Sequence, residues 1–216
     1  MLKRIAALSA LLIPLSLATA CTEDVGAGKV AAKAAEPAAV EPADAAKAAE
    51  ARAVPVDAAR SRVHALGAKI TAKHPISFED FDASYRVDGG AIVGVDVTVK
   101  MDSLKADDDK LTAHLKDSDF FDVERHPTAT FKSAKIVAEA GDDGATHTVS
   151  GALTMHGVTQ NISFPAKLSD RDGRLDTSAE FVINRKDYGI SYPGMPDDLI
   201  QDNVVLTIEL SADKPA

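Results

Sequence analysis

The sequence predicts an all-β protein of about eight antiparallel strands with one short helix. Three observations favour this fold class. Apolar and polar residues alternate over most of the chain beyond Pro55, turn signals containing glycine separate the alternating segments, and only one stretch has helical spacing. Such strands can pack as a two-sheet sandwich or close into a barrel, and closure removes the exposed edges that invite aggregation.

The first residues of the chain have the anatomy of a secretory signal. Lys3 and Arg4 precede an apolar run at 5–17 that is too short to span a membrane, and small residues follow at 18–20. Cys21 is the only cysteine of the chain, and the letters ATAC at 18–21 resemble a bacterial lipobox. We therefore expect a signal peptide over 1–20, a lipidated Cys21 and a periplasmic protein anchored to a membrane. Ordinary cleavage after Ala20, which leaves a free thiol, is the alternative.

Residues 21–53 form a segment rich in Ala, Glu, Lys and Pro, with no large apolar residue to bury. This composition predicts a flexible linker between Cys21 and the folded domain, interrupted by Pro37 and Pro42. Acidic residues outnumber basic ones in this segment, so it is not a basic patch for a membrane surface. Membrane attachment is therefore expected to depend on Cys21.

The folded domain is expected over residues 54–213, where the alternation is most regular. The clearest strand is 93–101, in which Val and Met alternate with Gly, Asp, Thr and Lys. Glycine-containing pairs at 89–90, 156–157 and 172–173 predict hairpin turns. The one helical stretch is Lys105–Lys116, where Leu111 and Leu115 are one turn apart. The other alternating segments are 66–70, 81–87, 129–137, 149–155, 158–168, 175–183 and 204–210.

The stretch 116–137 joins the expected helix to a strand. Pro127 ends the helical region and favours extended backbone at His126, and the alternation beyond it slips near Ser133, which predicts a β-bulge. Phe120 and Phe121 stand among acidic residues ahead of the proline. They predict either an apolar plug that closes one end of a hollow fold or a helix-to-strand corner stapled onto an ordinary core.

Three separated motifs occur in the same order in a known family. DSDFFDVERHPTATFKS at 117–133, SGALTMHGVT at 150–159 and INRKDYGI at 183–190 resemble the YceI-like family of polyisoprenoid-binding, lipocalin-like proteins. The resemblance extends over roughly Val56 to Leu210. It implies an eight-stranded antiparallel β-barrel that holds a long apolar chain, such as a polyisoprenoid, a quinone-type lipid or a fatty amide.

The resemblance places the expected ligand site in the barrel lumen. Small residues on the apolar faces leave room for a slim ligand, although they also suit closely packed sheets around a solid core. Burying about ten methylene groups at about 0.8 kcal/mol each gives about 8 kcal/mol, near the free energy of a micromolar complex. We expect Arg185, in the loop at 184–203, to meet a polar head group or else to pair with nearby aspartates. The side chains expected to line the lumen are Val97, Val99, Phe131, Leu153, Ile162, Phe164, Phe181 and Leu206.

Composition and spacing argue against several other functions. The chain of 216 residues has a formal net charge of −9 and no basic stripe, which argues against a nucleic-acid partner. Its six histidines show neither H-x-x-x-H nor H-E-x-x-H spacing, so no metal site is expected. The sequence contains no nucleophile elbow and no nucleotide-binding glycine loop, and no cofactor is expected.

The sequence therefore favours a carrier or sequestering protein that performs no covalent chemistry. The alternative is a protein-interaction module of envelope assemblies, whose barrel is solid and whose loop docks a protein partner. A lipid-modifying enzyme is the least favoured class, because no catalytic constellation accompanies the barrel. A homodimer is compatible with the sequence.

Overall fold

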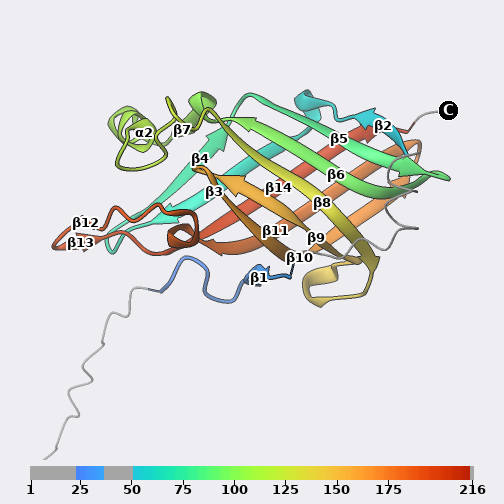
Figure 1. Ribbon diagram of the computed structural model, residues 1–216. Coiled ribbons are helices and arrows are strands. Elements are labelled where there is room, and N and C mark those ends of the chain that lie inside the picture. The colour runs from blue at the N-terminus through green and yellow to red at the C-terminus, as the bar shows by residue number, and fades with distance from the viewer. Residues whose placement is uncertain (1–22, 37–50, 215–216) are drawn as a thin grey trace, which may run out of the picture.

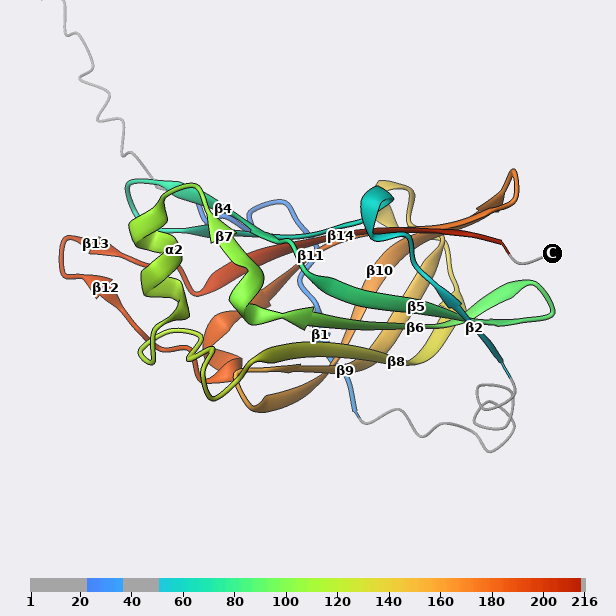
Figure 2. The ribbon, with the colours of Figure 1, turned by 90° about the horizontal axis from the view of Figure 1, so that it is seen from above.

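The computed structural model describes residues 23–36 and 51–214. Its main feature is one strongly curled antiparallel sheet, with a helix across one end (Figures 1 and 2). The predicted signal peptide, Cys21 and the middle of the predicted linker lie outside the described residues. In the part of the chain that is described, no helix is long and apolar enough to cross a membrane.

The main sheet follows the strand order β2-β5-β6-β8-β9-β10-β11-β14-β3-β4-β7. The prediction of an antiparallel all-β fold is confirmed. Among the described residues, eight strands have seven or more residues, and the short strands β2, β4 and β7, which alternation did not separate, extend the wall. The bounds are β2 (Arg52–Pro55), β3 (Arg62–Ala68), β4 (Lys73–Phe78), β5 (Phe81–Asp88), β6 (Ala91–Lys100), β7 (Leu104–Ala106), β8 (Thr128–Ala138), β9 (His147–Met155), β10 (Val158–Arg171), β11 (Arg174–Asn184) and β14 (Asn203–Asp213).

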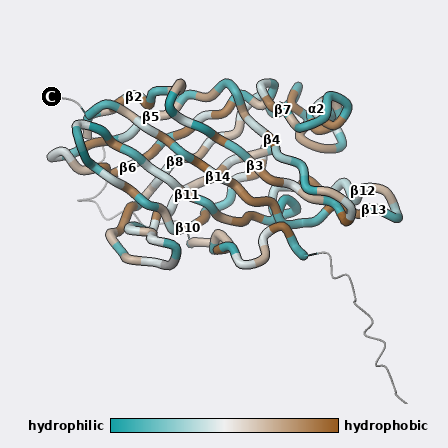
Figure 3. Tube along the Cα trace, turned by 180° about the vertical axis from the view of Figure 1, so that it is seen from behind, coloured by the Kyte–Doolittle hydropathy of each residue, from teal (hydrophilic) through white to brown (hydrophobic). Residues whose placement is uncertain are grey.

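Tight turns and one bulge set the register of the long strands. Met155 pairs with Val158 across His156 and Gly157, whose φ angles are 51° and 73°, as a two-residue type I′ hairpin turn requires. The register of β8 against β9 shifts between Ser133 and Lys135, which confirms the predicted bulge. Figure 3 shows apolar and polar residues distributed along the strands, and burial alternates along β3, β5 and β11, so these strands turn one face to the interior.

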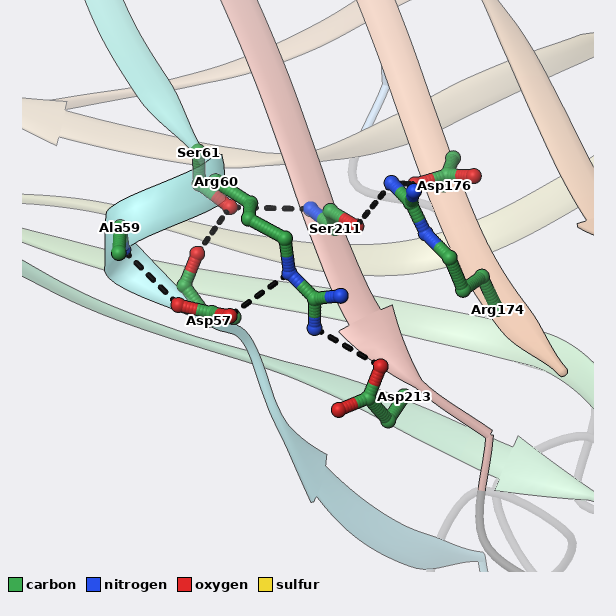
Figure 4. A network of polar contacts seen from close by, with 8 residues as sticks. All are labelled: Asp57, Ala59, Arg60, Ser61, Arg174, Asp176, Ser211 and Asp213. Atoms are coloured by element: carbon green, nitrogen blue, oxygen red, sulfur yellow. Dashed lines mark hydrogen bonds and ion pairs between the residues drawn. The ribbon is translucent and has the colours of Figure 1, made fainter.

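The segment that leads from β2 through the 3₁₀ turn η1 (Ala58–Arg60) joins β5 to β14 across the seam of the barrel. The Val56 amide donates to the Ala83 carbonyl of β5 at 2.9 Å, and the Asp57 amide donates to the Ser211 carbonyl of β14 at 2.8 Å. Arg60 pairs with both Asp57 and Asp213 in the network that Figure 4 shows. The seam is thus held at the end of the molecule away from the helix (Figure 1).

Helix α2 (Asp109–Lys116) is shorter than the predicted Lys105–Lys116. Asp108 caps it, because its carboxylate accepts hydrogen bonds from the amides of Lys110 and Leu111. The residues just before the cap are extended instead, since β7 pairs with β4. Sheet pairing therefore determines where the helix begins.

The described residues of the N-terminal segment differ from the expected flexible linker. Residues 30–35 fill a split in the barrel wall between β10 and β11, which pair with each other only over 167–171 and 174–178. Strand β1 (Lys33–Ala34) pairs antiparallel with β10, and Ala31 bridges to Val182 of β11. The Val182 amide donates to the Val30 carbonyl at 2.9 Å, and the Ala32 amide donates to the Val182 carbonyl at 2.7 Å.

The physical reason for this docking is the backbone of the split strands. A barrel wall that parts leaves amides and carbonyls without partners, and any extended segment can supply them whatever its side chains. Val25 adds a buried side chain, with 3% of its surface exposed, against Val182 and Val205. Composition does not reveal this role, because the hydrogen bonds are made by main-chain atoms.

Candidate ligand-binding cavity

A cavity of about 440 Å³ lies at the end of the barrel that helix α2 covers. Its wall comes from strands β3, β4, β11 and β14, and its roof comes from α2, the corner at 117–127 and the loop between β11 and β14. In both ribbon views the helix and the small hairpin of β12 (Gly194–Met195) and β13 (Asp198–Leu199) lie at this end (Figures 1 and 2). The volume is within the range typical of small-molecule sites.

The wall of the cavity is built from residues in register on neighbouring strands. Leu206 of β14 pairs with Ala65 of β3, and Ala65 pairs with Ile76 of β4, so the three form one row. Val204 pairs with Ile183 of β11 in the next row. All five line the cavity. The wall is therefore apolar because alternation puts the same face of four strands inward.

The roof of the cavity is an aromatic and aliphatic cluster. Leu115 of α2 is buried, and Leu111, one turn earlier, also lines the cavity. The Tyr192 ring meets the His114 ring edge-on, with centroids 4.9 Å apart, and lies 6.2 Å from the Phe120 ring. These contacts join the helix, the corner and the loop, which are far apart in the sequence. The predicted plug residues Phe120 and Phe121 both line the cavity at this end.

Arg185 holds the shape of the loop. Its side chain is buried, and it donates from Nη1 to the Ile190 carbonyl at 2.8 Å and from Nε to the Gln201 carbonyl at 3.0 Å. Burial lowers the pKa of the guanidinium, and the charge of Asp202 opposes that shift. Arg185 lines the cavity, as a head-group contact requires, but most of its donors face the loop backbone. Its expected role toward a ligand head group remains a prediction.

An exposed rim surrounds the opening. Asp198 of β13 accepts from the Lys69 ammonium and from the Thr71 amide and hydroxyl, so the small hairpin is latched to the β3–β4 turn. The hydrogen bond from Lys69, aided by Thr71, holds the pKa of the Asp198 carboxyl below its ordinary value. Met195 and Leu199 on the same hairpin are 62% and 47% exposed. Of these two, Met195 lines the cavity, so an exposed apolar side chain lies beside the opening.

The other predicted lumen residues lie outside the lining of this cavity. The rings of Phe164 and Phe181 stack with centroids 4.0 Å apart, and Phe131 packs 5.4 Å from Phe164. This stack fills the interior beyond the cavity. Of the predicted ligand contacts, Leu206 and Arg185 line the cavity, and the roles of the rest stay predictions. The predicted residues that are absent from the lining, and that belong to or pack against the buried core clusters, are Val97, Val99, Phe131, Leu153, Ile162, Phe164 and Phe181.

Sequence reasoning did not select the roof and the β3–β4 wall as ligand contacts. The spacing of Leu111 and Leu115 predicted an apolar helix face, which is a usable signal for a lid over the barrel end. Ile190 and Tyr192 follow a strand within a loop too long for a hairpin, and length alone marks such loops as candidate lids. Which of their side chains face inward depends on the three-dimensional path of the loop.

Residues 55–212 match the YceI-like domain. The chain belongs to the YceI-like family. UPF0312 proteins of Pectobacterium atrosepticum and Pseudomonas putida are each 32% identical to it, over 53% and 55% of this chain. These matches cover 62% and 64% of the relatives, so the chain spans about three fifths of the length of the curated relatives it matches.

Solved structures share the YceI-like fold. BcnA of Burkholderia cenocepacia superposes with a TM-score of 0.65 at 22% identity, covering 73% of this chain and 99% of that protein. A polyisoprenoid binding domain from Saccharophagus degradans gives a TM-score of 0.61 at 16% identity, covering 77% of this chain and all of that domain, 100%. At these identities the likeness establishes the fold, and the lipocalin-like barrel expected from the motifs is confirmed.

Proposed function

We propose that this YceI-like protein binds a long apolar molecule in the cavity under helix α2 and carries or sequesters it without covalent chemistry. The observation that carries the proposal is the cavity of about 440 Å³ with a predominantly apolar lining. Eligible ligands are polyisoprenoids, quinone-type lipids and fatty amides, because each presents a methyl-rich or methylene-rich chain. The polyisoprenoid binding domain of Saccharophagus degradans, which shares the fold, supports the first of these classes.

The depth of the cavity limits how much of a long chain can be enclosed. The stacked rings of Phe164 and Phe181 close the interior behind it. A chain of about ten methylene groups gains about 8 kcal/mol by burial before the cost of association. A longer polyisoprenoid then extends out of the opening past Met195, or it displaces the aromatic stack.

We further propose that the protein acts in the periplasm, attached to a membrane through lipid on Cys21. The support is the apolar run at 5–17 followed by the lipobox-like letters at 18–21. The exposed Met195 side chain at the opening, on the same hairpin as exposed Leu199, suits transfer of an apolar chain to or from a bilayer. A membrane anchor and an apolar rim together keep the opening near the source of ligand.

Filling the cavity tests the proposal directly. Ala65 is buried, lines the cavity and lies between Leu206 and Ile76 in the wall, so A65F places an aromatic ring in the space for ligand. The matched control is A152F on β9, whose partners Asn161 and Lys132 show that it lies on the outward face. We expect A65F to lose at least about tenfold in affinity for a fluorescent long-chain fatty amide or a polyprenol, and A152F to keep wild-type affinity. Equal affinities of A65F and wild type would exclude this cavity as the site.

A protein-interaction module of envelope assemblies is the second candidate function. The observation that favours it is the Phe131, Phe164 and Phe181 cluster, which makes part of the barrel interior solid. Its docking surface would be the exposed hairpin that carries Met195 and Leu199. In that case the wild-type protein binds no apolar probe, whereas M195D with L199D loses a protein partner that the wild type retains on pull-down.

A further inference from the structure

Three potential metal ligands from two distant parts of the sequence meet at the rim of the barrel. Asp122 and His126 belong to the corner at 117–127, and His156 opens the turn between β9 and β10. One donor atom from each of the three side chains lies within 4.8 Å of the other two. Sequence spacing gave no sign of this group, because the fold and not a helical repeat brings the histidines together.

The corner presents Asp122 and His126 from the same tight turn. The Asp122 carbonyl accepts hydrogen bonds from the amides of Arg125 at 3.0 Å and His126 at 2.8 Å. Asp122 itself has a positive φ of 47°, and 5% of its surface is exposed. Arg125 contacts the Oδ2 atom of this carboxylate from both Nε and Nη2, which fixes the orientation of the carboxylate. A buried carboxylate in a conformation that is rare for residues other than glycine is therefore fixed beside an imidazole.

His156 has the hydrogen bond that is typical of a histidine ligand. Its Nδ1 lies 3.0 Å from the Tyr188 carbonyl oxygen, which can only accept, so Nδ1 carries a proton and Nε2 is the nitrogen that offers a lone pair in the neutral ring. Metal-bound histidines commonly donate their other ring nitrogen to a backbone carbonyl in this way, which fixes the ring orientation. The tautomer and direction of His156 are thus set before any ion arrives.

Gly157 provides the space for the second imidazole. The His126 and His156 rings lie edge to face with centroids 4.8 Å apart. A Cβ atom at position 157 would stand 2.7 Å from the His126 Cε1 atom, closer than side chains tolerate. Gly157 also has a φ of 73°, so glycine is required there for two independent reasons. The absence of a side chain at Gly157 leaves room for the His126 ring.

We propose that Asp122, His126 and His156 bind a divalent transition-metal ion of the zinc class. Two imidazole nitrogens and one carboxylate oxygen form a donor set that suits Zn²⁺, with water as a fourth ligand on the solvent side. Tetrahedral ligands at about 2.0–2.1 Å from the ion stand about 3.4 Å from one another. The donors, which lie within 4.8 Å of one another, therefore approach by at most about 1.4 Å on binding, and side-chain rotation on fixed turns can supply this.

The ion would join three parts of the cavity rim. Phe121 and Met155, the chain neighbours of Asp122 and His156, line the cavity, and the carbonyl that orients His156 belongs to the 3₁₀ turn η4 (Arg185–Tyr188). Metal binding would pin the corner to the β9–β10 turn without touching the apolar interior. None of the three proposed ligands lines the cavity, so ion binding is independent of the molecule that the cavity holds.

Zinc titration of the untagged full chain, treated with EDTA and then dialysed, tests the site by calorimetry. We expect one ion per chain, and H126A and H156A each to weaken binding at least about tenfold. H147A is the matched control, because His147 is also half-buried but lies at the far end of β9, where it contacts Thr146. Its affinity should equal that of the wild type. Absence of stoichiometric binding, or equal affinities of wild type, H126A and H156A, would overturn the proposal.

Spectroscopy and thermal unfolding distinguish loss of the metal site from loss of folding in the variants. Co²⁺ in place of Zn²⁺ should give the visible absorption bands of a tetrahedral site in wild type and H147A, and should lose them in H156Q. Zn²⁺ should also raise the Tm of wild type and H147A, since an ion that binds only the folded state stabilises it. A Tm shift in H156Q as large as in wild type would contradict the assignment of His156.

Discussion

Removal of the Arg185 side chain should destabilise the loop between β11 and β14, which covers the cavity. The guanidinium donates to the carbonyls of Ile190 and Gln201 at 2.8 and 3.0 Å, while its contacts to Ile200 and Asp202, both at 3.4 Å, are too long to weigh heavily. In R185M the methionine side chain fills the space of the apolar part of the arginine. The carbonyls of Ile190 and Gln201, however, lose their hydrogen-bond donor. At about 1–3 kcal/mol for each of the two carbonyls left unpaired, the free energy of unfolding should fall by roughly 2–6 kcal/mol.

Urea unfolding, followed by far-UV circular dichroism, measures that change. The control is K186M, because Lys186 is an exposed neighbour whose ion pair to Asp202 should contribute less than about 1 kcal/mol. R185K should stabilise the loop only in part, since one ammonium does not reproduce the planar fork that reaches separate carbonyls. If R185M and K186M unfold at the same urea concentration, or R185K equals wild type, Arg185 does not hold the loop as described.

Three further predictions concern the wall, the rim and the docked N-terminal segment. A Cβ at Gly151 would stand 2.4 Å from a carbonyl oxygen of β8, so G151A should lower the free energy of unfolding by about 1–3 kcal/mol, whereas G67A, where the nearest atom is 3.9 Å away, should not lower it. The hydrogen bond from Lys69 holds the pKa of Asp198 below 3.8, so the ionised carboxylate stabilises the fold above that pH, and this stabilisation disappears as the pH falls through the lowered pKa. D198N should lose this part of the acid dependence of Tm. A pH profile of Tm identical to that of the wild type would contradict the prediction. V25D should detach the segment at 23–36 and lower the free energy of unfolding by about 2 kcal/mol. It should also speed hydrogen exchange at the Val182 amide, which donates to the Val30 carbonyl. Unaltered exchange at this amide would show that the segment is not held there.

Local patterns in the sequence predicted much of the barrel. Strand β6 follows directly from the alternation at 93–101, and the turn at 156–157 has the positive φ angles that its glycine suggested. The slip of phase near Ser133 predicted the bulge between β8 and β9. Each of these features depends on residues within a few positions of one another, so the printed sequence contains the information needed.

The parts that sequence reasoning missed depend on contacts between distant segments. Strand β1 docks through main-chain hydrogen bonds to Val182, which leave no mark in an alanine-rich composition. Which apolar residues line a cavity and which fill a core depends on ring packing, so Phe164 and Phe181 could not be distinguished in advance from Ile183 and Val204. All four side chains face inward from their strands. They differ only in whether another side chain or the cavity lies opposite them.

The most direct test of the central proposal is native mass spectrometry of the chain from residue 21 onward, with C21S to prevent lipidation, purified without detergent. The sample is measured as isolated and after incubation with polyprenols, quinones and fatty amides, and bound material is extracted into organic solvent and identified. Our account predicts a one-to-one adduct with a long-chain apolar molecule in wild type, and its loss in A65F but not in A152F. A mass that stays that of the protein alone under all these conditions would contradict ligand binding in the cavity and favour the protein-interaction module.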